Sequence, residues 1–80
     1  MNDVKKLGKQ IGKEVKRLRL AQDITVKELS ELCGLCEASL YKIEGGSANL
    51  TLHSVVSICN ALHIEAQDFI AGAFENVQNS

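Results

Sequence analysis

The sequence predicts an all-α fold, with five helices in one small domain. Apolar residues recur at three- and four-residue steps, the 80 residues include no proline, and 45% of them are apolar, which suits a folded core. A chain of this length buries only about 60% of the surface of its unfolded state, so it is marginally stable alone and gains from dimerising.

The first half of the chain contains three predicted helices. An apolar stripe predicts a long helix over residues 4–21, with lysines and arginines on its other faces. Thr25 followed by Glu28 forms a capping box, which predicts the start of a second helix over residues 26–33. Gly34 accepts the left-handed conformation that ends a helix, and a third helix follows over residues 37–45.

The second half contains two more predicted helices. Thr51 is a natural N-cap for a fourth helix over residues 52–62, and we expect its inward side chains to be Leu52, Val55, Val56, Cys59 and Leu62. A fifth helix is expected over residues 66–73. Residues 75–80 form a polar tail that we expect to fray, so the predicted domain spans residues 1–74.

Charge divides the chain into a basic front and an acidic back. Residues 1–27 carry eight Lys and Arg residues and three Asp and Glu residues, a net charge of +5. Residues 28–80 carry one Lys and seven Asp and Glu residues, a net charge of -6. An anionic partner would favour the front, although an ordinary solvated helix face has the same pattern.

Three cysteines, an odd number, suit a reducing compartment better than a disulfide framework. A zinc site would need four ligands, drawn from Cys33, Cys36, Cys59 and either His53 or His63. Because Cys33 and Cys59 occupy predicted core positions, we expect no metal.

The sequence shows no other functional site and no targeting or membrane-spanning segment. It offers no cofactor site, no small-molecule site and no interpretable set of nucleophile and base, so we do not expect an enzyme. No apolar run approaches the length of a membrane span or a signal core, and we expect a cytoplasmic protein.

The middle of the chain has the pattern of a helix-turn-helix. Leu29 and Cys33 share one helix face, Gly34 makes the turn, and Leu40 and Ile43 share a face of the next helix. Two short helices joined in this way must bury these residues against a third helix. The second helix of such a pair enters the major groove of DNA. An ordinary α-hairpin inside a small bundle is the alternative.

From Ile11 to Ile70 the stretch "IGKEVKRLRL…ITVKELSELCGLCEASLYKIEGG…LTLHSVVSICNALHIEAQDFI" resembles the phage-repressor/Cro (lambda-repressor-like, XRE) family of helix-turn-helix proteins. The segment "SANLTLHSV" is also similar to the small controller proteins of restriction-modification systems. The resemblance implies a five-helix DNA-binding domain that regulates transcription as a homodimer on double-stranded DNA. Its operator would be palindromic, with half-sites about one helical turn apart.

The resemblance also implies roles for individual residues. Arg19 and Glu44 match a pair that forms a salt bridge between the first and third helices. Cys36 takes the place usually held by Ser or Thr just before the recognition helix, where the helix N-terminus favours a thiolate. The expected DNA contacts are Thr25, Val26, Lys27, Cys36, Glu37, Ala38, Ser39, Tyr41, Lys42, Gly46, Ser47 and Asn49.

Two positions depart from the family pattern. Val26 stands where Gln is usual, and Glu37 stands where a polar donor is usual. A glutamate cannot donate to guanine, but it can accept from the amino group of cytosine. Two interpretations follow: an unusual, cytosine-containing operator, or a protein-interaction module that keeps the fold without specific DNA binding.

The end of the chain predicts the dimer interface. This segment would give a monomer more exposed apolar surface than it needs, through the side chains of Ile64, Phe69, Ile70 and Phe74. The alternative is that these side chains only close the core of the monomer.

Overall fold

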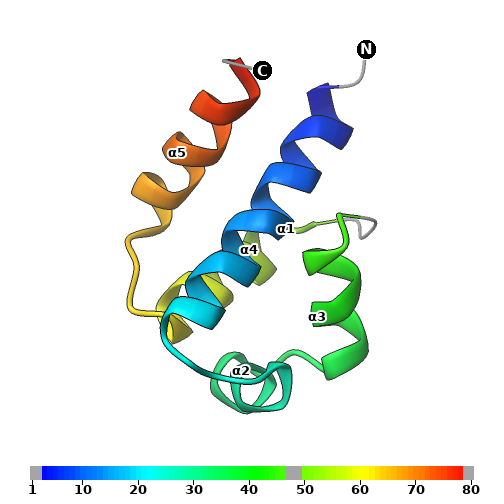
Figure 1. Ribbon diagram of the computed structural model, residues 1–80, viewed down its shortest axis with the longest axis vertical. Helices are drawn as coiled ribbons and strands as arrows, with labels where there is room; N and C mark the ends of the chain where they lie inside the picture. Colours follow the sequence, from blue (N-terminus) through cyan, green and yellow to red (C-terminus); the bar gives the residue numbers. More distant parts are fainter. Residues whose placement is uncertain (1–2, 47–49, 79–80) are drawn as a thin grey trace.

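The computed structural model describes residues 3–46 and 50–78, and in this part of the chain the secondary structure is helical (Figure 1). This finding confirms the predicted all-α class. The five helices are α1 (Asp3–Ala21), α2 (Val26–Cys33), α3 (Glu37–Glu44), α4 (Leu52–Ala61) and α5 (Ala66–Gln78).

The five helices form a closed ring around the core. Among the described residues, α1 packs against α5 and α3, α3 also packs against α2, α2 against α4, and α4 against α5. In Figure 1, α1 descends and α5 ascends beside it, so the start of α1 and the end of α5 lie at the same end of the molecule. The turn between α2 and α3 lies near the opposite end.

The predicted helix ends are confirmed where local chemistry sets them. The Thr25 hydroxyl accepts from the Glu28 N–H at 3.1 Å, and the Glu28 carboxylate accepts from the Thr25 N–H at 2.8 Å. Gly34 ends α2 with φ of 80°, in the left-handed region that glycine adopts without strain. The Thr51 hydroxyl accepts from the Ser54 N–H at 3.1 Å at the start of α4.

The fifth helix is longer than the sequence predicted. It continues to Gln78, through most of the segment that we expected as a tail beginning at residue 75. Residues 75–78 include no glycine and no proline, so no residue there breaks the helix. The packing of α5 along α1 also supports the longer helix.

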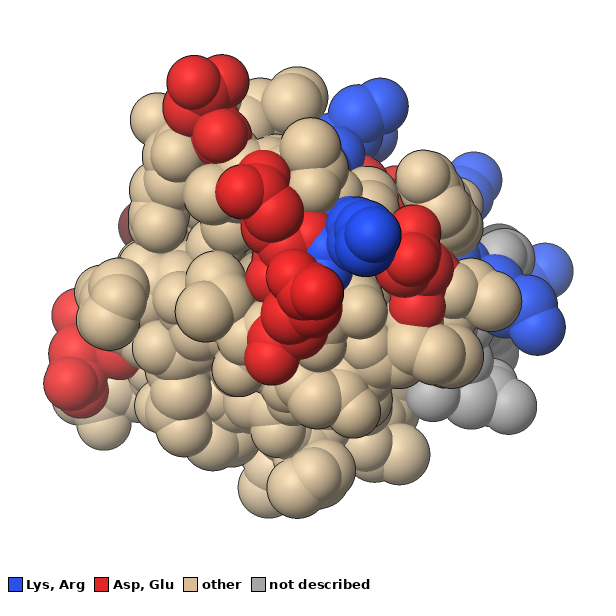
Figure 2. Space-filling model, turned by 90° about the horizontal axis from the view of Figure 1, so that it is seen from below, with Lys and Arg blue, Asp and Glu red and all other residues tan. Residues whose placement is uncertain are grey.

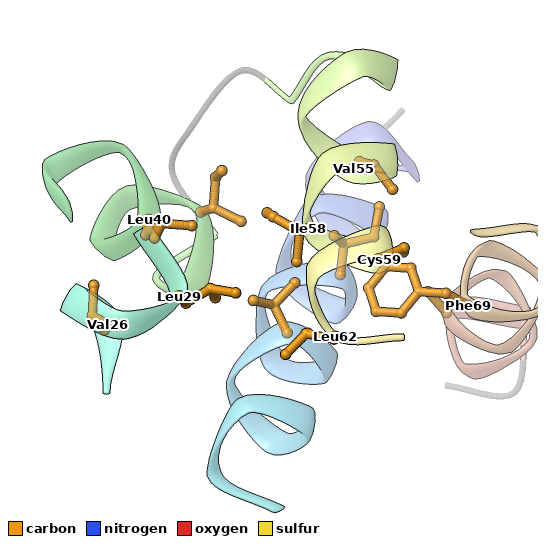
Figure 3. Packing of buried hydrophobic residues seen from close by; sticks show 12 residues of the cluster. Val26, Leu29, Leu40, Val55, Ile58, Cys59, Leu62 and Phe69 are labelled. Carbon is orange, nitrogen blue, oxygen red and sulfur yellow. The ribbon is translucent and has the colours of Figure 1, made fainter. Parts of the chain in front are cut away.

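The core lies at the centre of the ring, and two predicted core positions are wrong (Figure 3). Val56, which we expected to point inward, is half-buried and lies outside the core cluster. Figure 3 shows Phe69 of α5 reaching toward Cys59 of α4, which is 1% exposed. Leu52, which we expected to point inward, lies in the first turn of α4 and is 72% exposed. Ile58, which the prediction omitted, is 1% exposed and continues the buried stripe of Val55 and Cys59.

Candidate nucleic-acid interface

The turn between α2 and α3 fixes where the candidate recognition helix begins. The Gly34 N–H donates to the carbonyl of Ser30 at 2.9 Å, which closes the last turn of α2. Leu35 then packs against the core as a half-buried side chain. Two residues after Gly34, the backbone of Cys36 is extended, with φ of -75° and ψ of 156°, and α3 starts at Glu37.

Cys36 occupies the N-cap position of α3 without a side-chain hydrogen bond to the helix backbone. Its Sγ lies 3.1 Å from the hydroxyl oxygen of Ser39, and the thiol is exposed. The hydrogen bond with the Ser39 hydroxyl, together with nearby backbone N–H groups at the start of α3, holds the pKa of the Cys36 thiol below its ordinary value.

One side of α3 is buried and the other is exposed. Leu40 and Ile43 enter the core with 0% and 4% of their surface exposed. The exposed side chains of α3 are Glu37, Ala38, Tyr41 and Lys42, with Ser39 partly covered. Tyr41 is 61% exposed. This exposed side carries one carboxylate, one methyl group, one phenol and one ammonium group.

Arg19 and Glu44 join α1 to α3 through a bidentate ion pair. The Arg19 Nε donates to Glu44 Oε2 at 2.7 Å, and a terminal nitrogen donates to Oε1 at 3.1 Å. The other terminal nitrogen donates to the carbonyl of Ile24 at 2.8 Å. The two side chains are 9% and 7% exposed. The hydrogen bonds that Arg19 donates to Glu44 raise the pKa of Arg19, and the charged pair fixes α3 against α1.

The start of α2 offers fewer side chains for binding than the sequence predicted. Thr25 and Lys27 are exposed, but the side chain of Val26 is 6% exposed and belongs to the core. Only the backbone of Val26 remains for contact with a ligand. Gly46 starts the connection to α4 with φ of 77°. Ser47 and Asn49, two further expected contacts, lie outside the described residues.

The residues expected at a dimer surface differ in burial. Phe69 is 6% exposed within the single chain, so little of its ring is left for a partner. Ile64 and Ile70 are half-buried and pack against the core. Phe74 belongs to α5, but its side chain lies outside the described part of the molecule.

The close approach of α1 and α3 was not predicted from the sequence. Gly12 of α1 is buried, and a Cβ atom there would overlap the carbonyl oxygen of Ile43 and lie 2.9 Å from that of Glu44. Only glycine fits at this crossing. A glycine inside an apolar helix pattern gives a weak signal of close packing, and it does not reveal the partner helix.

Other kinds of site find little support in the described residues. Within residues 3–46 and 50–78, no three His, Cys, Asp or Glu side chains gather as metal ligands would. An open hollow of about 390 Å³ between α2 and α4 is lined by Leu32, Cys33, Ser57, Asn60, Ala61 and His63. None of the described helices has the length and apolar character needed to cross a membrane.

A two-helix unit with a tight glycine turn, held by a third helix and exposing one side of its second helix, defines the helix-turn-helix class. A family model described as "Helix-turn-helix domain" matches residues 10–68, which is most of the chain. The protein therefore belongs to the helix-turn-helix domain family. No curated protein sequence gives a significant match.

Several solved structures share this fold. The restriction-modification controller protein C.AhdI from Aeromonas hydrophila is 26% identical, with a TM-score of 0.74 over 78% of this chain and 94% of that chain. A single-site mutant of the restriction-modification controller protein C.Esp1396I is 24% identical, with a TM-score of 0.80 over 90% and 91%. The clp gene regulator ClgR from Corynebacterium glutamicum is 22% identical, with a TM-score of 0.82 over 90% and 77%.

Proposed function

We propose that the protein is a sequence-specific transcriptional regulator that binds double-stranded DNA as a homodimer. The observation that carries this proposal is the exposed side of α3, which the turn at Gly34 and the ion pair of Arg19 with Glu44 hold in one orientation. Family membership and the likeness to regulators and restriction-modification controllers agree with it. The proposed role is binding rather than catalysis, and the proposed location is the cytoplasm.

The proposed base contacts come from the N-terminal half of α3. Glu37 would accept a hydrogen bond from the amino group of cytosine, and Ala38 would contact the methyl group of thymine. Tyr41 and Lys42 lie one turn later. Thr25, Lys27 and Cys36, with the backbone amide of Val26, would contact phosphates and fix the position of α3 on the duplex. The Gly46 N–H already donates to the carbonyl of Ile43 at 3.0 Å, so Gly46 would only shape the segment after α3.

A second candidate is a protein-interaction module on the same fold. Its support is the charge of the helix-turn-helix itself. Residues 25–46 carry Lys27 and Lys42 against four glutamates, a balance of -2. Figure 2, which views the α2 end of the molecule, shows carboxylates across the middle and left of this face. Such a surface repels phosphate and suits a basic protein partner.

Selection of bound fragments from a random duplex DNA library, at low salt with reductant, distinguishes the two candidates. We expect a two-fold symmetric motif with half-sites about one helical turn apart. Absence of enrichment by the folded protein would reject the DNA-binding proposal and favour the protein-interaction module.

The variant Glu37→Gln tests the assignment of α3 within the same experiment. If Glu37 reads cytosine, the selected base at one position of each half-site should change, with a discrimination of about 1–3 kcal/mol. Glu31→Gln is the matched control, because it removes the same charge from an exposed position on α2. An unchanged motif with Glu37→Gln would contradict the assignment of Glu37 as a base-reading residue.

A further inference from the structure

The helix-turn-helix carries too little positive charge to hold a DNA duplex by itself. Double-stranded DNA has one negative charge for about every 1.7 Å of its axis, and neutralising phosphates supplies most of the nonspecific affinity. The balance of -2 over residues 25–46 opposes this attraction. A DNA-binding function therefore requires cationic side chains from another part of the molecule.

Helix α1 supplies such side chains in an ordered row. The lysine strip, which we define as Lys5, Lys9, Lys13 and Lys16, has spacings of four, four and three residues. These spacings place the four side chains along one side of a helix. All four residues are exposed, and none forms a hydrogen bond or ion pair with another residue in the described ranges. Arg17 and Arg19, by contrast, are engaged by Glu14 and Glu44.

The strip lies beside the line along which α1 meets α3. Gly12 and Arg19 mark that line, since Gly12 abuts the carbonyls of Ile43 and Glu44 and Arg19 binds Glu44. On α1 the core residues Ile11 and Val15 lie to one side of this line. Helical periodicity places Lys9 and Lys13 on the opposite side.

The exposed part of α3 opens toward this same side. Leu40 and Ile43 face the core, whereas Glu37 and Tyr41 lie on the other flank of α3. Tyr41 is close enough to α1 to contribute to the raised pKa of Arg19. The exposed flank of α3 and the lysine strip of α1 therefore form neighbouring parts of one surface.

Lys9 connects the strip to the segment that follows α3. A Cβ atom at Gly46 would lie 2.9 Å from Cγ and 3.1 Å from Cα of Lys9, so the stem of this lysine packs on the glycine. Packing of the stem leaves the ammonium group at the surface, as is usual for lysine. Figure 2 shows Lys and Arg side chains along the right and upper right margin of this face, and one more near its middle between acidic groups.

We propose that the lysine strip of α1 is a phosphate-binding track that follows the DNA backbone beyond the base pairs contacted by α3. This inference rests on the proposed DNA-binding function and assigns to α1 the electrostatic attraction that the helix-turn-helix lacks. Base identity is read on α3, and the strip contributes affinity without regard to sequence.

The test compares the salt dependence of binding to the selected motif. The slope of log K against log salt is negative, and the double variant Lys9→Gln/Lys13→Gln should reduce its magnitude by about 1.8, or about 0.9 for each lost phosphate contact. Its selected motif should stay the same. The matched control Asn60→Asp/Gln67→Glu changes the net charge by the same two units at exposed positions on α4 and α5. Circular dichroism verifies that both variants are folded.

The outcomes separate this inference from the function on which it rests. A reduced slope in the strip variant and a wild-type slope in the control would support the track. An unchanged slope in the strip variant, or an equal reduction in both variants, would overturn the track and leave DNA binding intact. Failure of the wild-type protein to bind any duplex would instead overturn the proposed function itself.

Discussion

Arg19 has the largest set of directed contacts of any described side chain, since it donates to Glu44 twice and to the carbonyl of Ile24. Such a pair contributes little net free energy when it is compared with an apolar pair, but loss of one partner leaves a charge without compensation in a buried place. Its role is therefore to fix geometry. It holds α3 and the end of α1 in one arrangement.

We expect Arg19→Met to lower the free energy of unfolding by about 3–5 kcal/mol, because Glu44 would remain buried without its cation. The double variant Arg19→Met/Glu44→Met should recover part of this loss. Urea denaturation followed by circular dichroism measures both. A loss below about 1 kcal/mol in the single variant would show that the pair is not effectively buried.

The three cysteines should react in an order set by exposure and by pKa. Cys36 is exposed and its pKa is lowered by Ser39, while burial raises the pKa of Cys59. Iodoacetamide should therefore modify Cys36 first, and the midpoint of its pH-rate profile should lie below that of an ordinary thiol. Ser39→Ala should move this midpoint upward. Peptide mapping by mass spectrometry identifies the modified residue, and equal midpoints in the two proteins would contradict the role of Ser39.

The elements show which features a single sequence can reveal. The capping box at Thr25 and the glycine stop at Gly34 depend on residues within one turn of each other, so the sequence predicted them correctly. The exposed Leu52 and the buried Ile58 depend on where other helices cover α4. Helical spacing alone cannot supply that information.

The candidate site shows the same division between local and tertiary information. The exposed side chains of α3 could be inferred from its helical spacing, because Leu40 and Ile43 had to be buried. The burial of Val26 and the contact of Lys9 with Gly46 follow from the crossing of separate elements. Both features change which residues are available to a ligand, and neither can be predicted from a local sequence pattern.

The crossing of α1 and α3 gives a prediction for two glycines. Gly12→Ala would push a methyl group into backbone carbonyls that cannot rotate away, and we expect a loss of about 1–3 kcal/mol in the free energy of unfolding. Gly72 in α5 is the control, since a Cβ atom there meets nothing within 4 Å. Gly72→Ala should stabilise the protein by about 0.5–1 kcal/mol because alanine favours the helix. Thermal unfolding would refute the close crossing if both variants were more stable than the wild type.

At the scale of the whole molecule, small size favours assembly. A domain of 80 residues has a thin margin of stability, and burial of surface between two copies would increase it. Ile64 and Ile70 remain half-buried in the single chain, whereas Phe69 is already covered. If α5 forms the dimer surface, the half-buried isoleucines are the better sites for testing it.

We expect the protein to sediment as a dimer above micromolar concentration, and Ile70→Lys to sediment as a monomer. The lysine would place a charge in an apolar contact, which is costly unless the charge is paired. Sedimentation velocity gives the mass, and circular dichroism shows whether the variant keeps its helices. A wild-type protein that stays monomeric well above micromolar concentration would exclude this homodimer.

The closed ring of helices has a consequence for how the chain can be rearranged. Each helix is supported by two neighbours, and α1 and α5, the first and last in the chain, are themselves in contact. The helices follow one order along the chain and another around the core, where the ring runs α1, α3, α2, α4, α5. The packing therefore does not require the chain to begin at α1. A circular permutant that joins α5 to α1 by a short linker and opens the chain between α3 and α4 would keep every one of these helix contacts.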